Sequence, residues 1–221
     1  MTLPILYVGN RNYSSWSLRP WLVLTWSKLP FETRTLQLGG DGYGHRAMAS
    51  VLAVSPSGAV PALHVDGEII GDSLAISEWA AEKAPALWPK DPTARALARA
   101  AAAEMHSGFS ALRSGFPCNI RRRAEPRVLT AEVRRDVERV EAIWTGLRRR
   151  FGAGGPYLFG TTPTIADAFF TPVATRFRTY QVTLGKEASD YAAALLAEPA
   201  FREWEASALA ETWTMPQWDQ A

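Results

Sequence analysis

The sequence predicts a small α/β domain followed by an all-helical domain. Residues 1–83 alternate short β-rich runs with stretches of helical periodicity, whereas residues 93–221 show helical periodicity only. Between them, residues 84–92 (APALWPKDP) contain three prolines, a composition typical of a linker. A chain of 221 residues is long enough for two such units. We therefore expect an α/β domain at 1–83, a linker at 84–92 and an all-helical domain at 93–221.

The chain opens with a strand, a helix and a second strand. Residues 3–9 (LPILYVG) form a short β-rich run, and SSWSLRPWLVLTWSKL then places apolar residues at helical spacing. Ser14 or Ser15 can cap this helix, and Pro30 ends it. Residues 31–38 alternate enough to form the second strand, so the pattern is βαβ.

The rest of the first domain continues as helix, hairpin and helix. The expected elements are a glycine-rich turn at 39–44, a weak helix at 45–52, strands at 62–65 and 68–70, and a helix that continues to Pro85. Asp66-Gly67 tolerates positive φ and suits a two-residue turn between the strands. Asp72 or Ser73 can cap the last helix. The order is therefore β-α-β-α-β-β-α.

The second half is predicted to contain helices alone. Helical periodicity covers residues 93–116, 130–151, 164–180, 189–196 and 199–209. Thr164 and Asp167 match a capping box with Asp in place of Glu, which assigns this motif to folding rather than to catalysis.

Composition and charge exclude several kinds of function. The formal net charge is +2, and arginine clusters such as 121–123 are typical of solvated helix faces, so we expect no nucleic-acid partner. Apolar stretches are too short to span a membrane. The single cysteine, Cys118, favours a reducing, cytoplasmic location. His45, His64 and His106 lack the close spacing of metal ligands, so we expect no metal.

Three motifs in order resemble those of the glutathione S-transferases: residues 13–22 (YSSWSLRPWL), 59–76 (AVPALHVDGEIIGDSLAI) and 162–173 (TPTIADAFFTPV). The resemblance covers nearly the whole chain, and the first motif looks like the zeta-class sequence SSCSWRVRIAL with Trp16 in place of cysteine. It implies a thioredoxin-like N-terminal domain with a mixed four-stranded sheet, a C-terminal helical bundle, glutathione as co-substrate and a homodimer.

The resemblance also implies where glutathione binds. A cis Val60–Pro61 bond would let the Val60 backbone pair with the tripeptide as a strand would. Asp72 and Ser73 would begin a helix, so that backbone N–H groups there and the Ser73 hydroxyl would bind the γ-glutamyl carboxylate. His45 is a candidate for the glycine carboxylate, with a solvent-exposed loop histidine as the alternative.

Glutathione must be held as its thiolate, because an unperturbed thiol has a pKa of about 8.5. Lowering that pKa by about two units requires roughly 2.7 kcal/mol, which one hydroxyl hydrogen bond and a helix N-terminus can supply. In the zeta-like register Ser14 occupies the catalytic position, and Ser15 and Tyr13 remain alternatives.

The second substrate is expected between this motif and the first helices of the second domain. Candidate contacts for the electrophile are Trp16, Phe109, Arg113, Phe116, Cys118 and Arg176. We expect a glutathione transferase that attacks a small electrophile. The alternatives are a maleylacetoacetate-type isomerase, a non-catalytic ligand-binding protein and a scaffold domain. Gly58 and Ala59 replace zeta-class Lys and Gln, and Thr179 stands where that class has arginine, which weighs against the isomerase.

Overall fold

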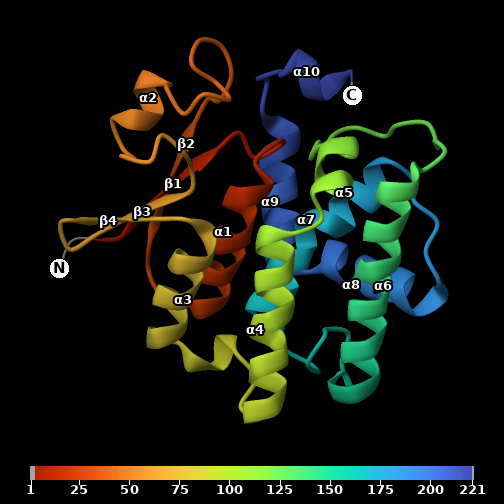
Figure 1. The fold of residues 1–221 in the computed structure, drawn as a ribbon. Coiled ribbons are helices and arrows are strands. Elements are labelled where there is room, and N and C mark those ends of the chain that lie inside the picture. The colour runs from red at the N-terminus through yellow and green to blue at the C-terminus, as the bar shows by residue number, and fades with distance from the viewer. Residues whose placement is uncertain (1–2, 221) are drawn as a thin grey trace.

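The computed structural model describes residues 3–220, and these contain a four-stranded mixed sheet in the order β2–β1–β3–β4 (Figure 1). β1 (Ile5–Gly9) runs parallel to β2 (Glu32–Leu36) and antiparallel to β3 (Ala62–Val65), and β3 pairs antiparallel with β4 (Glu68–Gly71). Because side chains alternate along a strand, Leu6 and Val8 of β1 are fully buried on one face.

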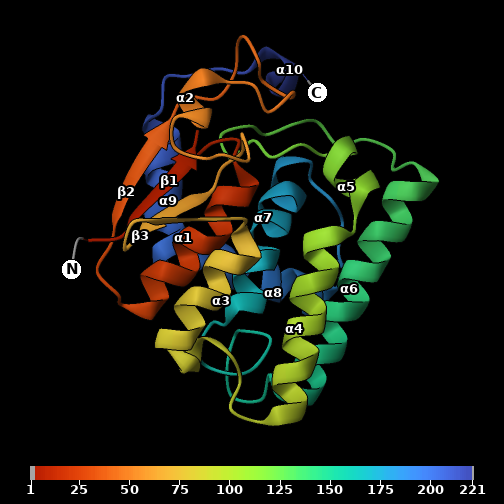
Figure 2. The same ribbon diagram turned by 60° about the vertical axis from the view of Figure 1, so that its left-hand side comes forward.

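Three helices belong to this half: α1 (Ser15–Ser27), α2 (Ala49–Leu52) and α3 (Ser73–Lys83). Helices α1 and α3 pack together on the side of the sheet that faces the second half (Figures 1 and 2). Helix α2 lies away from that side, in the long connection between β2 and β3.

The second half contains helices. They are the 3₁₀ turn η1 (Pro85–Leu87), α4 (Pro92–Ser107), α5 (Ser110–Gly115), α6 (Ala131–Phe151), α7 (Ile165–Thr179), α8 (Lys186–Ala197), α9 (Pro199–Ala210) and α10 (Pro216–Asp219). Helix α7 is buried along almost its whole length and packs against α1, α4 and α8. One continuous apolar core therefore joins the two halves, and α1 is held between the sheet and α7.

The predicted architecture, mixed α/β and then all-α, is confirmed. The Asp66-Gly67 turn also forms as predicted, with φ of 51° and 85° at its two residues. The division at 84–92 stays a prediction, because the buried core runs across it without a break.

Two local expectations differ from the structure, and two short elements were not expected. The stretch 93–116 is two helices, because Phe109 has φ of 58° and interrupts the chain between α4 and α5. The weak helix at 45–52 is reduced to α2, and η1 and α10 were not expected at all.

Candidate active site

The turn between β1 and α1 is fixed by Asn10, which is fully buried. The Asn10 carbonyl accepts the N–H groups of Tyr13 at 3.1 Å and of Ser14 at 2.8 Å. Its side-chain amide exchanges hydrogen bonds with the backbone of Leu38, at 2.6 and 3.4 Å. The three candidate hydroxyls therefore start from a rigid backbone. The sequence pattern did not point to Asn10, whose partner lies 28 residues away.

Ser14 is the N-cap of α1. Its Oγ accepts the N–H of Ser17 at 3.4 Å, and its hydroxyl donates to the Ser17 Oγ at 2.8 Å. The Ser17 Oγ also accepts the N–H of Gly9 at 3.1 Å. The first turn of a helix carries partial positive charge, so an anion beside Ser14 is stabilised.

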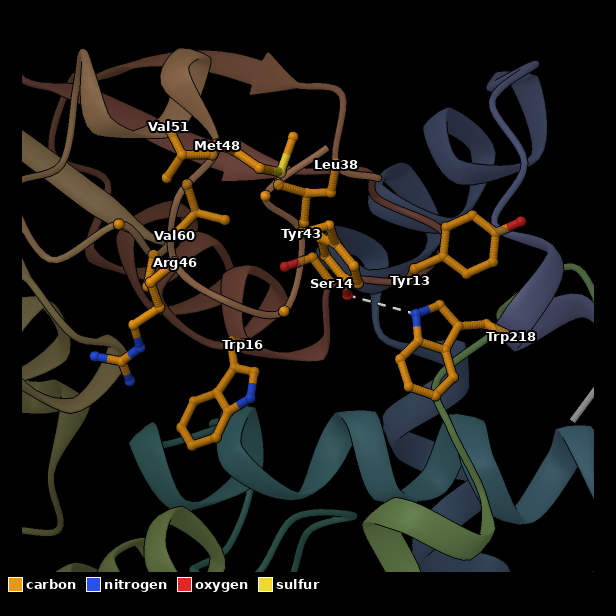
Figure 3. Close-up of a pocket in the computed structure, with 14 residues that line it drawn as sticks. Tyr13, Ser14, Trp16, Leu38, Tyr43, Arg46, Met48, Val51, Val60 and Trp218 are labelled. Atoms are coloured by element: carbon orange, nitrogen blue, oxygen red, sulfur yellow. Dashed lines mark hydrogen bonds between the residues drawn. The ribbon is translucent and has the colours of Figure 1, made fainter. Parts of the chain in front are cut away.

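Ser14 lines a cavity of about 400 Å³, called here the first cavity. Val60 lines the same cavity from the loop before β3, and Figure 3 shows the two residues around one space. The Val60–Pro61 bond is cis, and Pro61 itself is buried. Strand pairing with β1 begins at Ala62, so Val60 lies outside the sheet ladder and beside Ser14.

His45 is exposed and does not line the first cavity. Its neighbours Tyr43 and Arg46 line it instead. The loop from 39 to 48 therefore contributes to the site through residues that the sequence pattern did not single out.

Asp72 and Ser73 lie at the start of α3 as expected, but neither residue lines the first cavity. Asp72 Oδ1 accepts the N–H groups of Leu74 at 2.7 Å and Ala75 at 3.2 Å, and Asp72 Oδ2 lies 3.3 Å from His106 Nε2. Ser73 is fully buried, and its hydroxyl has no hydrogen-bond partner among the described residues. A buried hydroxyl without a partner is costly, so a ligand that bonds to it would be stabilised there.

The Tyr13 hydroxyl is turned away from the first cavity (Figure 3). It donates to Asp219 at 2.7 Å and accepts from Arg121 at 3.1 Å and from the N–H of Met215 at 3.2 Å. Burial, and then the hydrogen bond to Asp219, raise the pKa of Tyr13. Its aromatic ring still lines the cavity, but its hydroxyl is fully engaged elsewhere.

Ser15 opens into a second cavity of about 450 Å³, which Arg113 and Arg176 also line. Arg176 is only 4% exposed and donates to the Ser15 Oγ at 3.2 Å and to the Phe116 carbonyl at 2.8 Å. Burial lowers the pKa of both arginines, and the charge of Arg176 lowers the pKa of Arg113 further. Two cations beside one cavity favour an anionic occupant.

The remaining candidates for the electrophile site divide into two groups. Trp16 and Cys118 line the second cavity. Phe109 and Phe116 do not line it: both are buried in the apolar core, and Phe116 stacks on Tyr180 with 4.5 Å between ring centroids. Phe109 lies at the break between α4 and α5 and Phe116 directly follows α5, and both rings point into the core, so a contact of either ring with the electrophile stays a prediction that this arrangement does not favour.

Trp16 is placed by cations on α1 and α5. The guanidinium groups of Arg19 and Arg113 lie 4.4 and 4.5 Å from its ring centroid. Arg19 is fully buried, and burial lowers its pKa to about 9. The indole is therefore a fixed wall of the site rather than a mobile surface ring.

Residues 3–220 contain no group of three or more His, Cys, Asp or Glu side chains arranged to hold a metal ion. In the same part of the chain, no helix is both long and apolar enough to cross a membrane.

A thioredoxin-like half, an all-helical half and a serine-capped helix beside a cis-proline loop define the class of glutathione transferases. A family model for the N-terminal domain of glutathione S-transferases matches residues 13–83, and one for their C-terminal domain matches residues 130–207. The chain belongs to the glutathione S-transferase family, a class of glutathione-dependent enzymes.

Among curated relatives, the chain is 31% identical to a maleylacetoacetate isomerase of Pseudomonas aeruginosa, over 90% of this chain and 93% of the relative. It is also 31% identical to a maleylpyruvate isomerase of Ralstonia, over 81% and 84% of the two chains. Among solved structures, a zeta-class maleylpyruvate isomerase in its holo form superposes with a TM-score of 0.70 at 24% identity, over 96% of this chain and all of that one. A glutathione transferase homologue from Burkholderia with bound glutathione superposes with a TM-score of 0.70 at 23% identity, over 95% of this chain and all of that one.

Proposed function

We propose that this protein binds glutathione in the first cavity and that the Ser14 hydroxyl holds its sulfur as the thiolate. The observation that carries the proposal is the position of Ser14, which caps α1 and faces the loop of Val60 across one cavity. Ser15 is directed to the second cavity and to Arg176. The Tyr13 hydroxyl is occupied by Asp219, Met215 and Arg121, so the geometry favours Ser14 among the three candidates.

The hydrogen bond between Ser14 and Ser17 lets Ser14 donate to sulfur without losing a partner. In the absence of ligand, Ser14 donates to Ser17. When a thiolate arrives, Ser17 can become the donor to Ser14, and the Ser14 proton then turns to the sulfur. Ser17 stays anchored meanwhile, because its oxygen accepts the N–H of Gly9. A hydrogen bond to an anion contributes about 1.5–3 kcal/mol, and together with the positive end of α1 this is sufficient for the required change in the thiol pKa.

We further propose contacts for the rest of glutathione. The backbone of Val60, beside cis Pro61, pairs with the cysteinyl residue. The N-terminus of α3 takes the γ-glutamyl carboxylate through its backbone N–H groups and the unpartnered hydroxyl of Ser73. For the glycine carboxylate, Arg46 replaces His45 as the favoured cation, because Arg46 lines the cavity and His45 does not.

The second cavity favours an electrophile that carries a carboxylate. Arg113 and Arg176 both line it, and each loses part of its preference for the charged state through burial. A carboxylate would restore that preference, and the fork of a guanidinium matches its two oxygens. We therefore propose a small, anionic, electron-poor alkene or related acceptor as second substrate.

Isomerisation is the favoured form of this chemistry, because relatives bear the names maleylacetoacetate and maleylpyruvate isomerase. The thiolate would add to one carbon of a cis double bond, with the electron pair moving onto the conjugated carbonyl. After rotation about the resulting single bond, the pair would return and expel the thiolate, leaving the trans alkene and unchanged glutathione. Simple conjugation is the second candidate, and it differs in that the adduct is protonated and released.

A homodimer and a cytoplasmic location are also proposals. They are supported by membership of the family and by the single, buried Cys118, whose pKa burial raises. Sedimentation at several concentrations tests the dimer.

Two measurements test the proposed function. Calorimetry with glutathione at about millimolar concentration separates a glutathione enzyme from a scaffold domain that has lost binding. Maleylpyruvate and maleylacetoacetate are then supplied with catalytic amounts of glutathione. An isomerase converts them without consuming glutathione, a conjugating enzyme consumes it in equal amount, and a ligand-binding protein does neither.

A further inference from the structure

The first and second cavities meet at a ring of aromatic side chains. Four residues line both of them, and all four are aromatic: Tyr13, Trp16, Tyr43 and Trp218. We call these four residues the aromatic collar. Ser14 lines only the first cavity and Ser15 only the second. An electrophile that is held in the second cavity must therefore reach across the collar to meet a sulfur at Ser14.

Trp218 is the member of the collar that comes from the far end of the described chain. Its indole Nε1 donates to the Tyr43 hydroxyl at 3.4 Å, which links α10 to the loop before α2 (Figure 3). Figure 3 also shows Trp16 and Trp218 on opposite sides of Ser14 and Tyr43. The two indoles thus lie on either side of the passage between the cavities.

The segment that carries Trp218, residues 211–219, is fastened at its start to the loop that precedes Ser14. The Glu211 carboxylate accepts the backbone N–H groups of Arg11 at 2.7 Å and Asn12 at 3.1 Å. The Arg121 guanidinium donates to the carbonyl of Glu211 and, at 2.7 Å, to that of Trp213. Charged hydrogen bonds of this kind are stronger than neutral ones, so the segment has a defined position.

The segment is fastened again at its other end. Asp219 accepts the Tyr13 hydroxyl at 2.7 Å and the Asn119 side-chain amide at 2.8 Å. The neighbouring Met215 is 1% exposed and donates its N–H to the same Tyr13 hydroxyl. Trp218 lies between these anchors, so its indole is positioned by the active-site loop itself.

We propose that Trp218 is a specificity-determining residue, which closes the aromatic collar and admits only flat or slender electrophiles to the sulfur. The inference rests on the proposed function, since it assumes glutathione at Ser14. A planar conjugated acceptor can pass between the two indoles and stack on either ring. An acceptor with bulky substituents clashes with the rings and is excluded.

The test compares Trp218→Ala with Trp213→Ala as matched control. Trp213 lies in the same segment but lines neither cavity. The probes are benzalacetone, a flat unsaturated ketone, and its ring tert-butyl derivative, which has the same reactive group and more bulk. We expect Trp218→Ala to raise the ratio of kcat/KM for the bulky ketone to that for the flat ketone about tenfold. Trp218→Phe should lie between it and the wild type, and Trp213→Ala should keep the wild-type ratio.

A ratio within twofold of wild type in Trp218→Ala, or an equal change in Trp213→Ala, overturns the proposal for Trp218. Thiolate formation with glutathione, followed by ultraviolet difference spectra, is expected to be the same in the wild type and in the control Trp213→Ala. If the wild type forms no thiolate, the proposed function fails, which distinguishes that failure from a failure of the collar alone. Where turnover of the ketones is slow, the ratio of calorimetric affinities for the glutathione conjugates of the bulky and the flat ketone takes the place of the ratio of kcat/KM values.

Discussion

Two helix N-termini in this molecule are both capped by hydrogen-bonding polar side chains, but the two caps serve different purposes. At α7, Asp167 is fully buried and accepts four hydrogen bonds: from the N–H and the hydroxyl of Thr164, both at 2.8 Å, from the N–H of Leu158 at 3.0 Å, and from the Tyr191 hydroxyl at 2.8 Å. At α1, the cap is Ser14, whose hydroxyl faces a cavity and has one neighbour, Ser17, that can exchange donor and acceptor roles with it.

The difference between the two caps shows when a helix cap can also serve as a ligand-binding site. A cap whose acceptors are all used inside the core stabilises the fold and offers nothing to a ligand. A cap with a proton that can be redirected into a cavity offers a hydrogen bond and the positive end of a helix to an anion. We therefore expect a variant of the α7 cap to lower mainly the stability of the fold, and a variant of the α1 cap to lower mainly the rate of the chemistry.

The largest effect is expected at Asp167. Replacement by Ala leaves four buried donors without their acceptor, and we expect the free energy of unfolding to fall by about 3 kcal/mol or more. Asp167→Asn keeps one acceptor oxygen and should lose about half as much. Urea unfolding measures both. A loss below about 1 kcal/mol for Asp167→Ala would show that this cap is not the anchor of α7.

Ser14→Ala should act on chemistry instead. We expect kcat to fall about a hundredfold, the cost of removing one donor to a developing anion, while the affinity for glutathione changes less than about threefold. Stability should fall by about 1 kcal/mol, as for loss of an N-cap. Ser15→Ala is the matched control and should change mainly the KM for the electrophile. Equal losses of kcat in the two variants would contradict the assignment.

A smaller effect, about tenfold, is expected when Arg113 is replaced by Gln. Arg113 lines the second cavity and is only partly buried, so the variant should fold. The KM for a carboxylate-bearing electrophile should rise, because a charge-assisted hydrogen bond is lost, and the KM for a neutral electrophile should change little. Equal changes for the two kinds of substrate would remove the case for an anionic electrophile.

The features that the sequence predicted correctly are local. The Asp66-Gly67 turn needs only two residues that tolerate positive φ, and the cap of α7 needs residues three apart. The break at Phe109 was missed because helical periodicity continues across it.

The site was predictable only in part, for the same reason. Ser14 and Val60 follow from motifs, but Ser14 and Ser15 differ in which cavity they face, and this depends on Arg176, which is 161 residues from Ser15. Trp218 reaches Tyr43 across 175 residues. No periodicity or local motif encodes such a meeting, so these contacts required the structure.

The smallest effect is expected from Tyr13→Phe. The hydroxyl that it removes points to Asp219 and not into the first cavity, and the raised pKa of Tyr13 keeps this phenol neutral at working pH. We therefore expect kcat to change less than about threefold, with somewhat greater mobility of the 211–219 segment in hydrogen exchange. A loss of kcat as large as that of Ser14→Ala would make Tyr13 the group that holds the sulfur.

The central claim is that Ser14 keeps the sulfur of bound glutathione ionised. Ultraviolet difference spectra of the glutathione complex, recorded against pH, measure that ionisation directly. The claim predicts a thiolate band in the wild type with an apparent pKa well below the free value of about 8.5, and a return toward that value in Ser14→Ala. A wild-type complex without the band, or a Ser14→Ala complex that keeps it at the same pH, would contradict the claim.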